Sequence, residues 1–157
     1  MSPGPLHIVI AAVAKAKAGP ERDLYDAYIA RLPWRVDLKE IEIKKDLAVD
    51  VRKAREGEAL LAAIPPGARL VALDERGRTE TSAAFAARLG RWRDDGVRTV
   101  AFVIGGADGL DETVRKKADF VLSFGALTWP HMLVRVLLAE QVYRAQSILA
   151  GHPYHRS

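Results

Sequence analysis

The sequence contains no cysteine. This absence excludes disulfide scaffolds, cysteine nucleophiles, thiolate zinc sites and iron–sulfur clusters, and it suits a reducing compartment. No uncharged apolar run reaches the roughly 18–20 residues of a membrane-spanning helix. No basic segment precedes the apolar run at residues 6–14, so a signal peptide is not expected either. We therefore predict a cytoplasmic protein with no membrane partner.

Three common catalytic motifs are also absent. The chain has no Gly-x-x-x-x-Gly-Lys-Ser/Thr phosphate loop, and its glycine cluster at residues 105–109 lacks the spacing of the dinucleotide-binding fingerprint. It has no Gly-x-Ser-x-Gly nucleophile elbow. ATP-dependent, NAD-dependent and serine-hydrolase chemistry are therefore disfavoured. The adjacent Asp74 and Glu75 could form a carboxylate pair, but neighbouring acids in a turn are more often solvated.

The composition is that of one ordinary globular domain. The chain has 157 residues, of which 49% are hydrophobic and 28% charged. The formal net charge of +4 mildly favours a polyanionic partner. Residues 121–157 are the most informative, because Glu140 is their only acid. This segment holds three arginines and three of the four histidines: Arg135, Arg144, Arg156, His131, His152 and His155.

Apolar runs and turn residues predict five strands that alternate with five helices. The strands are expected at residues 6–14, 36–43, 69–73, 99–104 and 120–123. The helices are expected to begin near Pro20, Asp50, Thr81, Asp111 and Pro130, and to end near Pro33, Ile64, Asp95, Ala118 and Ala150. A full helix joins the second and third strands, as a parallel crossover requires. We therefore predict a single α/β domain over residues 1–157, with a parallel sheet between helices.

Some local details are also predicted. In the strand predicted at residues 36–43, the alternation of apolar and polar residues is interrupted at Lys39 and Glu40, which indicates a bulge or a distorted edge. Asp50 is expected to cap its helix, and residues 74–80 are expected to form a polar turn. The last helix is apolar on almost every side, so we expect a second copy of the chain to cover one face, with Leu138 facing that partner.

Two glycine-containing loops follow neighbouring strands. Residues 105–109 follow the fourth strand and Phe124–Trp129 follows the fifth, at the edge where open α/β sheets bind ligands. Their backbone groups could hydrogen-bond an adenine ring, with Leu73, Leu127 and Trp129 as apolar walls. The alternative is purely structural, with a tight turn at the glycines and Thr128 as a helix cap.

The final residues, 152–157, combine two imidazoles, a phenol and a guanidinium with no carboxylate nearby. A tyrosine can stack on a base, an arginine can hold phosphate, and a histidine can move a proton near neutral pH. A frayed chain end is the alternative. A metal site at His152 and His155 is not expected, because Pro153 breaks the helical spacing and no third ligand is adjacent.

Several motifs occur together in one order along the chain. They are Leu73-Asp74, Ile104-Gly-Gly-Ala-Asp-Gly-Leu110, Ala126-Leu-Thr-Trp-Pro-His131, Leu133-Val-Arg-Val136, Glu140, Tyr143-Arg144 and His152-Pro-Tyr-His-Arg156. In these motifs the sequence resembles the RlmH family of ribosomal RNA methyltransferases over essentially its full length. The resemblance implies an S-adenosylmethionine-dependent enzyme of the SPOUT class with a C-terminal trefoil knot. It also implies a homodimer that methylates N3 of a pseudouridine in a hairpin loop of 23S rRNA, in the large subunit or whole ribosome.

The resemblance also assigns residues. Those implied to hold the cofactor are Leu73, Gly105, Phe124, Gly125, Ala126, Leu127, Thr128 and Trp129. Those implied to face the RNA are His131, Arg135, Arg144, His152, Tyr154, His155 and Arg156. Within the tail, His155 would accept a proton or stabilise the deprotonated base, Arg156 would offer positive charge to a uracil oxygen, and Tyr154 would stack on the base.

One departure lies at Ala14, where family members commonly have glycine. The alternative function is a ribosome-binding or assembly protein that kept the fold and lost catalysis, and binding of S-adenosylmethionine would separate the two.

Overall fold

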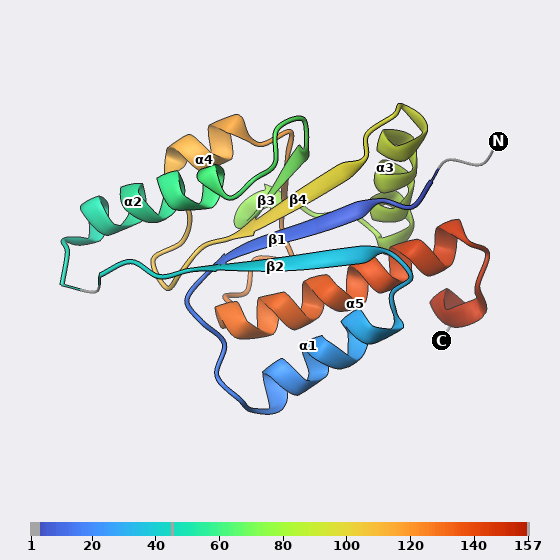
Figure 1. Cartoon of the computed structure of the whole chain (residues 1–157), viewed down its shortest axis with the longest axis horizontal. Coiled ribbons are helices and arrows are strands. Elements are labelled where there is room, and N and C mark those ends of the chain that lie inside the picture. The colour runs from blue at the N-terminus through green and yellow to red at the C-terminus, as the bar shows by residue number, and fades with distance from the viewer. Residues whose placement is uncertain (1–3, 45, 157) are drawn as a thin grey trace.

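The computed structural model describes residues 4–44 and 46–156, except for the side chains of His155 and Arg156. Within this part of the chain, five strands form one sheet in the order β2-β1-β4-β3-β5 (Figure 1). The strands are β1 (His7–Val13), β2 (Arg35–Ile41), β3 (Arg69–Arg78), β4 (Thr99–Ile104) and β5 (Phe120–Leu122). All neighbouring pairs are parallel. The carboxyl ends of the strands therefore share one edge, and the predicted α/β sheet is confirmed.

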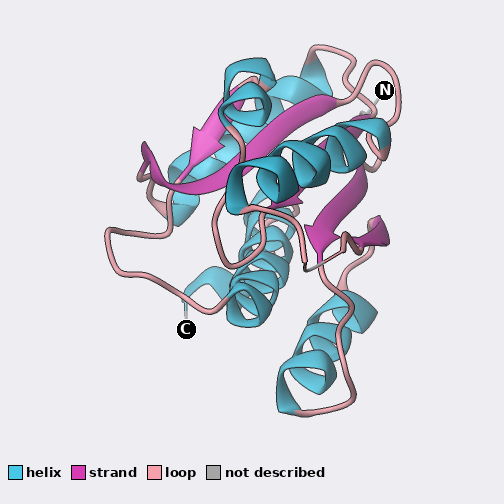
Figure 2. Cartoon of the chain, turned by 90° about the vertical axis from the view of Figure 1, so that its left-hand side faces the viewer, coloured by secondary structure: helices cyan, strands magenta, loops and turns pink. Residues whose placement is uncertain are grey.

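Helices cover both faces of the sheet (Figure 2). On one face, α1 (Pro20–Arg31), α3 (Ser82–Asp94) and α5 (His131–Leu149) enclose a core that includes Phe85, Phe102 and Leu138. On the other face lie α2 (Val49–Ala62) and α4 (Glu112–Lys117), with Leu60 and Val114 fully buried against the strands. Alternate residues of β1 and β4 enter the two cores, which explains their continuous apolar sequences.

The helix starts confirm some predicted caps and correct others. Helix α3 begins after Thr81, whose hydroxyl accepts a 3.0 Å hydrogen bond from the Ala84 N–H, as expected. Helix α2 begins at Val49 after Ala48, so the prediction that Asp50 caps it is wrong. Asp50 lies in the first turn, where its charge still complements the helix dipole. Helix α5 begins at His131 after Pro130 with no side-chain cap, so Thr128 is not its cap.

The predicted distortion of β2 is also wrong, because β2 pairs with β1 in continuous register from Arg35 to Ile41. The polar residues that interrupt its alternation have partners elsewhere. The Lys39 ammonium donates to the Ala63 carbonyl at 2.8 Å, and the Glu40 carboxylate accepts from the Ala16 N–H at 2.6 Å. An edge strand can carry such side chains because only one of its sides pairs within the sheet.

Strand β3 continues beyond the predicted polar turn. It runs to Arg78, and its register with β5 shifts between Leu73 and Arg78. The shift is accompanied by a close approach, because a Cβ atom at Gly77 would lie 2.5 Å from the Val121 carbonyl oxygen. The extension brings residues 74–78 beside the segment that follows β5.

Most of α5 is covered within its own chain. Leu138, predicted to face a partner, has no exposed surface and packs in the core between the sheet, α1 and α3, so that prediction is wrong. Three of the large apolar side chains left in solvent lie at the start of α5 and in the loop before it: Leu133 at 37%, Trp129 at 41% and Leu127 at 72% exposed. The others in the described part of the chain are Leu24 on α1 and Val49 and Val51 on α2. None of the helices in the described ranges is both long and apolar enough to span a membrane.

Candidate functional site

A cleft of about 420 Å³ lies at the carboxyl edge of the sheet. Seven of the eight residues predicted to hold the cofactor line it, together with His131: Leu73, Gly105, Phe124, Gly125, Leu127, Thr128 and Trp129. Among the described residues, Ala126 is the one member of that set that does not contribute to the lining. The two predicted loops therefore do meet in space around one cavity.

The first wall is the turn after β4. Gly106 and Gly109 bridge each other, and the Gly109 N–H donates to the Gly106 carbonyl at 3.0 Å. A Cβ atom at Gly105 would lie 2.8 Å from the backbone of Gly109 and 3.0 Å from the Leu110 nitrogen. Only glycine fits this position without moving the backbone, so the turn presents its peptide groups rather than side chains to the cleft.

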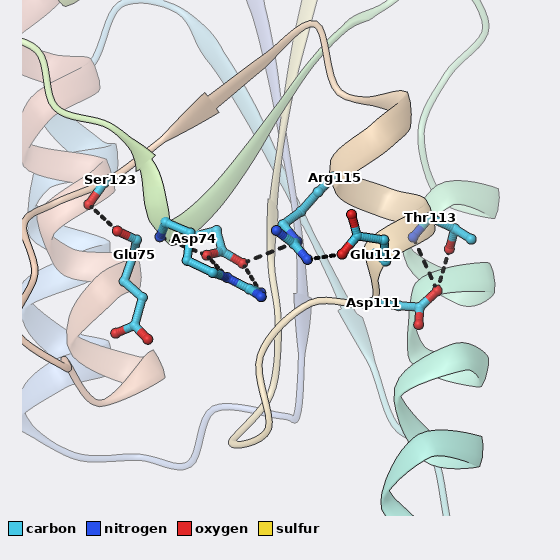
Figure 3. A network of polar contacts seen from close by, with 8 residues as sticks. Asp74, Glu75, Asp111, Glu112, Thr113, Arg115 and Ser123 are labelled. Atoms are coloured by element: carbon cyan, nitrogen blue, oxygen red, sulfur yellow. Dashed lines mark hydrogen bonds and ion pairs between the residues drawn. The ribbon is translucent and has the colours of Figure 1, made fainter.

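The second wall is the loop after β5, and Ser123 organises it. The Ser123 hydroxyl is buried and lies 3.2 Å from the Glu75 carbonyl oxygen and 3.1 Å from the Gly125 carbonyl oxygen, which share its one proton. It also accepts a 3.0 Å hydrogen bond from the Gly125 N–H. Figure 3 shows Ser123 beside Glu75 on the extension of β3. Nothing in the sequence singles out Ser123, because its partners lie 48 residues away or within its own turn.

The cleft floor carries a charged cluster that the sequence did not predict. The Asp74 side chain is only 5% exposed, which contradicts the expectation of a solvated turn. Burial raises the pKa of its carboxyl, but hydrogen bonds from Arg76 outweigh burial and leave the pKa below its usual value. Arg115 approaches from α4 at 3.7 Å and also pairs with Glu112 (Figure 3). Asp74 is thus held as a carboxylate on the floor of the cleft.

Arg135 is placed inside the protein. Its side chain is 3% exposed and donates to Glu40 Oε2 at 2.7 Å and to the carbonyl oxygens of Val13 (3.1 Å) and Ala14 (2.6 Å). A guanidinium engaged in this way holds the loop after β1 in place and has no free face for RNA. In this chain the predicted RNA contact is therefore better described as a structural tie.

His131 lies at the start of α5, beside the cleft. Burial lowers the pKa of its imidazole, and the positive charge of Arg135 lowers it further. The ring is therefore neutral at pH 7 and can both donate and accept a hydrogen bond.

The predicted catalytic tail folds against the far end of α5. Tyr154 stacks on Tyr143 with ring centres 4.6 Å apart, and the guanidinium groups of Arg31 and Arg144 lie 5.2 and 5.1 Å from the Tyr154 ring. Arg144 also pairs with Glu140 at 2.6 Å. The His152 Nδ1 accepts from the Tyr154 N–H at 3.1 Å.

None of the described tail residues lines the cleft. The cleft includes His131 at the start of α5, which extends about 27 Å to Leu149, whereas Tyr154 folds back onto Tyr143 and comes within 3.4 Å of Glu140 in the middle of the helix. The backbone of residues 153–156 forms a short 3-10 helix, but the side chains of His155 and Arg156 lie outside the described part of the structure. The described residues contain no cluster of histidine and acidic side chains that could hold a metal ion.

Comparison with known proteins gives one consistent result. Residues 6–155 match the family model described as predicted SPOUT methyltransferase. The chain is 59% identical over 152 residues to ribosomal RNA large subunit methyltransferase H of Rhodospirillum centenum, covering 97% of this chain and all of that protein. It is 60% identical over 151 residues to the protein of the same name from Paramagnetospirillum magneticum, covering 96% and 99% of the two chains.

Solved structures with low sequence identity share the fold. A probable methylase family protein from Haemophilus influenzae superposes with a TM-score of 0.60 at 13% identity, covering 95% of this chain and 70% of the other. A probable methyltransferase from Bordetella pertussis gives a TM-score of 0.56 at 13% identity, covering 90% and 96%. With the family model and the close relatives, these likenesses lead to one assignment. The chain belongs to the SPOUT methyltransferases and, within them, to the family of ribosomal RNA large subunit methyltransferase H.

Proposed function

We propose that the protein transfers a methyl group from S-adenosylmethionine to N3 of a pseudouridine in a hairpin loop of 23S rRNA, in the large subunit or whole ribosome. The observation that supports this most is the identity of about 60% to relatives named for methylation of large-subunit ribosomal RNA, over nearly all of both chains. The trefoil knot expected of the SPOUT class belongs to the same assignment and would lie where the chain passes from β5 to α5.

The cleft at the sheet edge suits the proposed cofactor. Its volume of about 420 Å³ lies within the range of small-molecule sites. Leu73, Ile104, Leu122 and Leu127 offer apolar surface, and the two glycine loops offer backbone donors and acceptors for a base and its sugar. When bound, the cofactor supplies an electrophilic methyl group on a sulfonium, so the protein has mainly to position the acceptor and remove its proton.

Replacing Gly105 by valine should remove cofactor binding. The added side chain would press on the backbone of Gly109 and Leu110, which cannot move aside as a flexible side chain could, so the turn would shift into the cleft. We expect affinity for S-adenosylmethionine, measured by calorimetry, to fall at least about 30-fold, which corresponds to a loss of about 2 kcal/mol. Gly4→Val, at an exposed position with nothing within 4 Å of the added Cβ, is the control for general effects of glycine replacement. Wild-type affinity in Gly105→Val would show that the cofactor binds elsewhere.

The tail supplies the proposed acid–base groups. His155 would accept the N3 proton or stabilise the deprotonated base, Arg156 would balance negative charge on a uracil oxygen, and Tyr154 would stack on the base. Arg144 and His152 would contribute RNA contacts from the same end of α5. These roles fit a reaction that needs positioning and charge stabilisation.

A homodimer would bring the tail to the cleft. Because the tail packs on α5 beside Glu140 and Tyr143, away from the cleft at His131, a two-fold arrangement with antiparallel α5 helices would place the tail of one copy beside the cleft of the other. The exposed Leu127, Trp129 and Leu133 give the start of α5 an apolar surface for such a contact. The proposed active site is therefore shared between two chains.

Methyl transfer to ribosomes tests the proposal directly. Labelled S-adenosylmethionine should transfer its methyl group to ribosomes that carry the pseudouridine and far less to ribosomes from cells that lack its synthase. We expect isolated stem-loops to be poor substrates, because a net charge of +4 gives limited affinity for naked RNA. Equal incorporation into both ribosomes would exclude pseudouridine as the target. Failure to bind S-adenosylmethionine would instead favour the non-catalytic ribosome-binding alternative.

A further inference from the structure

A second cleft, of about 940 Å³, adjoins the first. The two share Gly106, Ala107, Asp108 and His131, so they adjoin at the turn after β4 and the start of α5, which together form a shared boundary. The second cleft lies between the loop that follows β1, the segment that follows β2, and α2. A molecule in this cleft would meet the proposed cofactor at the shared boundary.

Glu56 of α2 lines this second cleft. It is only 7% exposed, and none of the described residues makes a hydrogen bond or ion pair with its carboxylate. The carboxylate lies beside the shared boundary, because a Cβ atom at Gly106 would come 3.3 Å from Glu56 Oε2. Burial raises the pKa of the carboxyl, and Arg52 opposes this, although the Arg52 side chain itself pairs with Asp108.

The Glu56 carboxylate is largely withdrawn from solvent, but its oxygens are not among the fully enclosed unpaired polar atoms of the described residues, so a ligand in the cleft can reach them and supply a donor. The cleft is lined by the cations Lys15, Lys17, Arg22, Lys44 and Arg52 and by the acids Glu21, Glu42, Glu56 and Asp108, so positive charges exceed negative charges by one. This small excess around an apolar interior suits a nucleobase whose flanking phosphates remain at the rim.

Pseudouracil has a donor that uracil lacks. Its glycosidic bond is formed by a ring carbon, which leaves an N1–H on the base edge, whereas uridine has a C–H at the equivalent position. N1 and N3 flank the same carbonyl, so one base can present N1–H to one group and N3 to another.

We propose that the second cleft binds the target base and that Glu56 accepts a hydrogen bond from its N1–H, which makes Glu56 the residue that distinguishes pseudouridine from uridine. The inference rests on the proposed function and deepens it. With the base seated in this way, N3 points across the shared boundary toward the proposed cofactor, where the two can come into contact. Uridine would place a carbon against the buried carboxylate and leave the carboxylate unpaired.

Glu56→Gln and Glu56→Leu test this assignment. The readout is kcat/KM for methylation of large subunits that carry pseudouridine or uridine at the target position. We expect the wild type to prefer pseudouridine by about 100-fold, the effect of one hydrogen bond to a charged group. The preference should fall about tenfold in Glu56→Gln, which keeps a neutral acceptor. It should disappear in Glu56→Leu, because activity on pseudouridine drops and activity on uridine does not.

Controls separate recognition from structure. Glu58→Gln, at an exposed position on the same helix, should keep the wild-type preference. Glu56→Leu should bind S-adenosylmethionine normally and should melt no lower than wild type, because it removes an unpaired buried charge. An unchanged preference in both Glu56 variants would overturn this inference while leaving the proposed function intact. A wild type that methylates neither substrate would overturn the proposed function and this inference with it.

Discussion

Removal of residues 152–157 should nearly abolish methyl transfer to ribosomes and leave the fold and cofactor binding intact. The described tail packs on α5 and on Arg31, and its Tyr154 contacts only the edge of one core, through Tyr143. Loss of the proposed proton acceptor and of its cationic neighbour should lower single-turnover transfer by about 1,000-fold, within the range known for general acid–base groups. Thermal unfolding and calorimetry with S-adenosylmethionine should change little. Full activity of the shortened protein would exclude the tail from catalysis.

Single substitutions in the tail show how much of the lost activity reflects slower methyl transfer and how much reflects weaker RNA binding. His155→Ala removes no formal charge from a neutral imidazole, so it should slow transfer at saturating ribosomes without weakening binding. Arg156→Ala should also weaken binding and give a shallower dependence of affinity on salt. Equal effects of the two variants on affinity and its salt dependence would mean that His155 acts only by contact.

Mixing two inactive proteins tests whether the site is shared. The tail-less protein keeps its cleft and Gly105→Val keeps its tail, so a mixed dimer contains one complete site. Random exchange at equal amounts should restore about a quarter of the wild-type sites. Leu133→Glu, introduced into both proteins at the exposed start of α5, should prevent recovery and give monomers in sedimentation. If the two proteins form mixed dimers but methyl transfer activity does not recover, the tail and the cleft of the same chain must form one site.

The sequence predicted the layers of the fold because each signal was local. Short stretches of sequence were sufficient to define individual strands and helices. The apolar runs predicted β1 and β4, the prolines at residues 20 and 33 predicted the ends of α1, and Thr81 predicted the start of α3. The continuation of β3 to Arg78 was missed because polar residues 74–78 form a strand only through their pairing with the segment after β5. The burial of Leu138 was missed because it depends on α1 and α3 packing on both sides of α5.

In the candidate site, too, features with a local sequence signal were predicted and features that depend on tertiary contacts were not. The glycine loops were predicted because both follow strands whose carboxyl ends meet at one edge. Glu56 and the Arg135–Glu40 pair were not predicted, since the pair joins residues 95 apart and burial of Glu56 depends on the turn after β4. An arginine in a polar segment has the same sequence signature whether it meets RNA or a carboxylate of its own chain.

The loop after β1 depends on Arg135. Ala14 has a φ angle of 78°, in the region that favours glycine, and this conformation costs about 1–2 kcal/mol for alanine. The resemblance predicted glycine at this position. The hydrogen bond from Arg135 to the Ala14 carbonyl, together with the bond to Val13, holds the strained turn against α5. The loop in turn forms one wall of the second cleft.

Arg135→Met should therefore be strongly destabilising. It removes one partner of a nearly buried ion pair and leaves two carbonyl oxygens without their donor, so the free energy of unfolding at pH 7 should fall by about 3 kcal/mol. Urea unfolding measures this, and Arg91→Met, at an exposed position on α3, should change it by less than about 0.5 kcal/mol. A loss below about 1 kcal/mol for Arg135→Met would show that the tie contributes little.

The decrease in stability at acidic pH tests the ion pair between Arg135 and Glu40. Burial raises the pKa of Glu40, but hydrogen bonds from Arg135 and the Ala16 N–H outweigh burial, so the pKa in the folded protein lies below its usual value. A depressed pKa contributes stability above the unfolded value, and this contribution is lost as the pH falls through the folded value. The difference in unfolding free energy between wild type and Arg135→Met should therefore be constant from about pH 6 to 8 and shrink below about pH 4. A difference independent of pH would mean that the carbonyl bonds, and not Glu40, account for the loss.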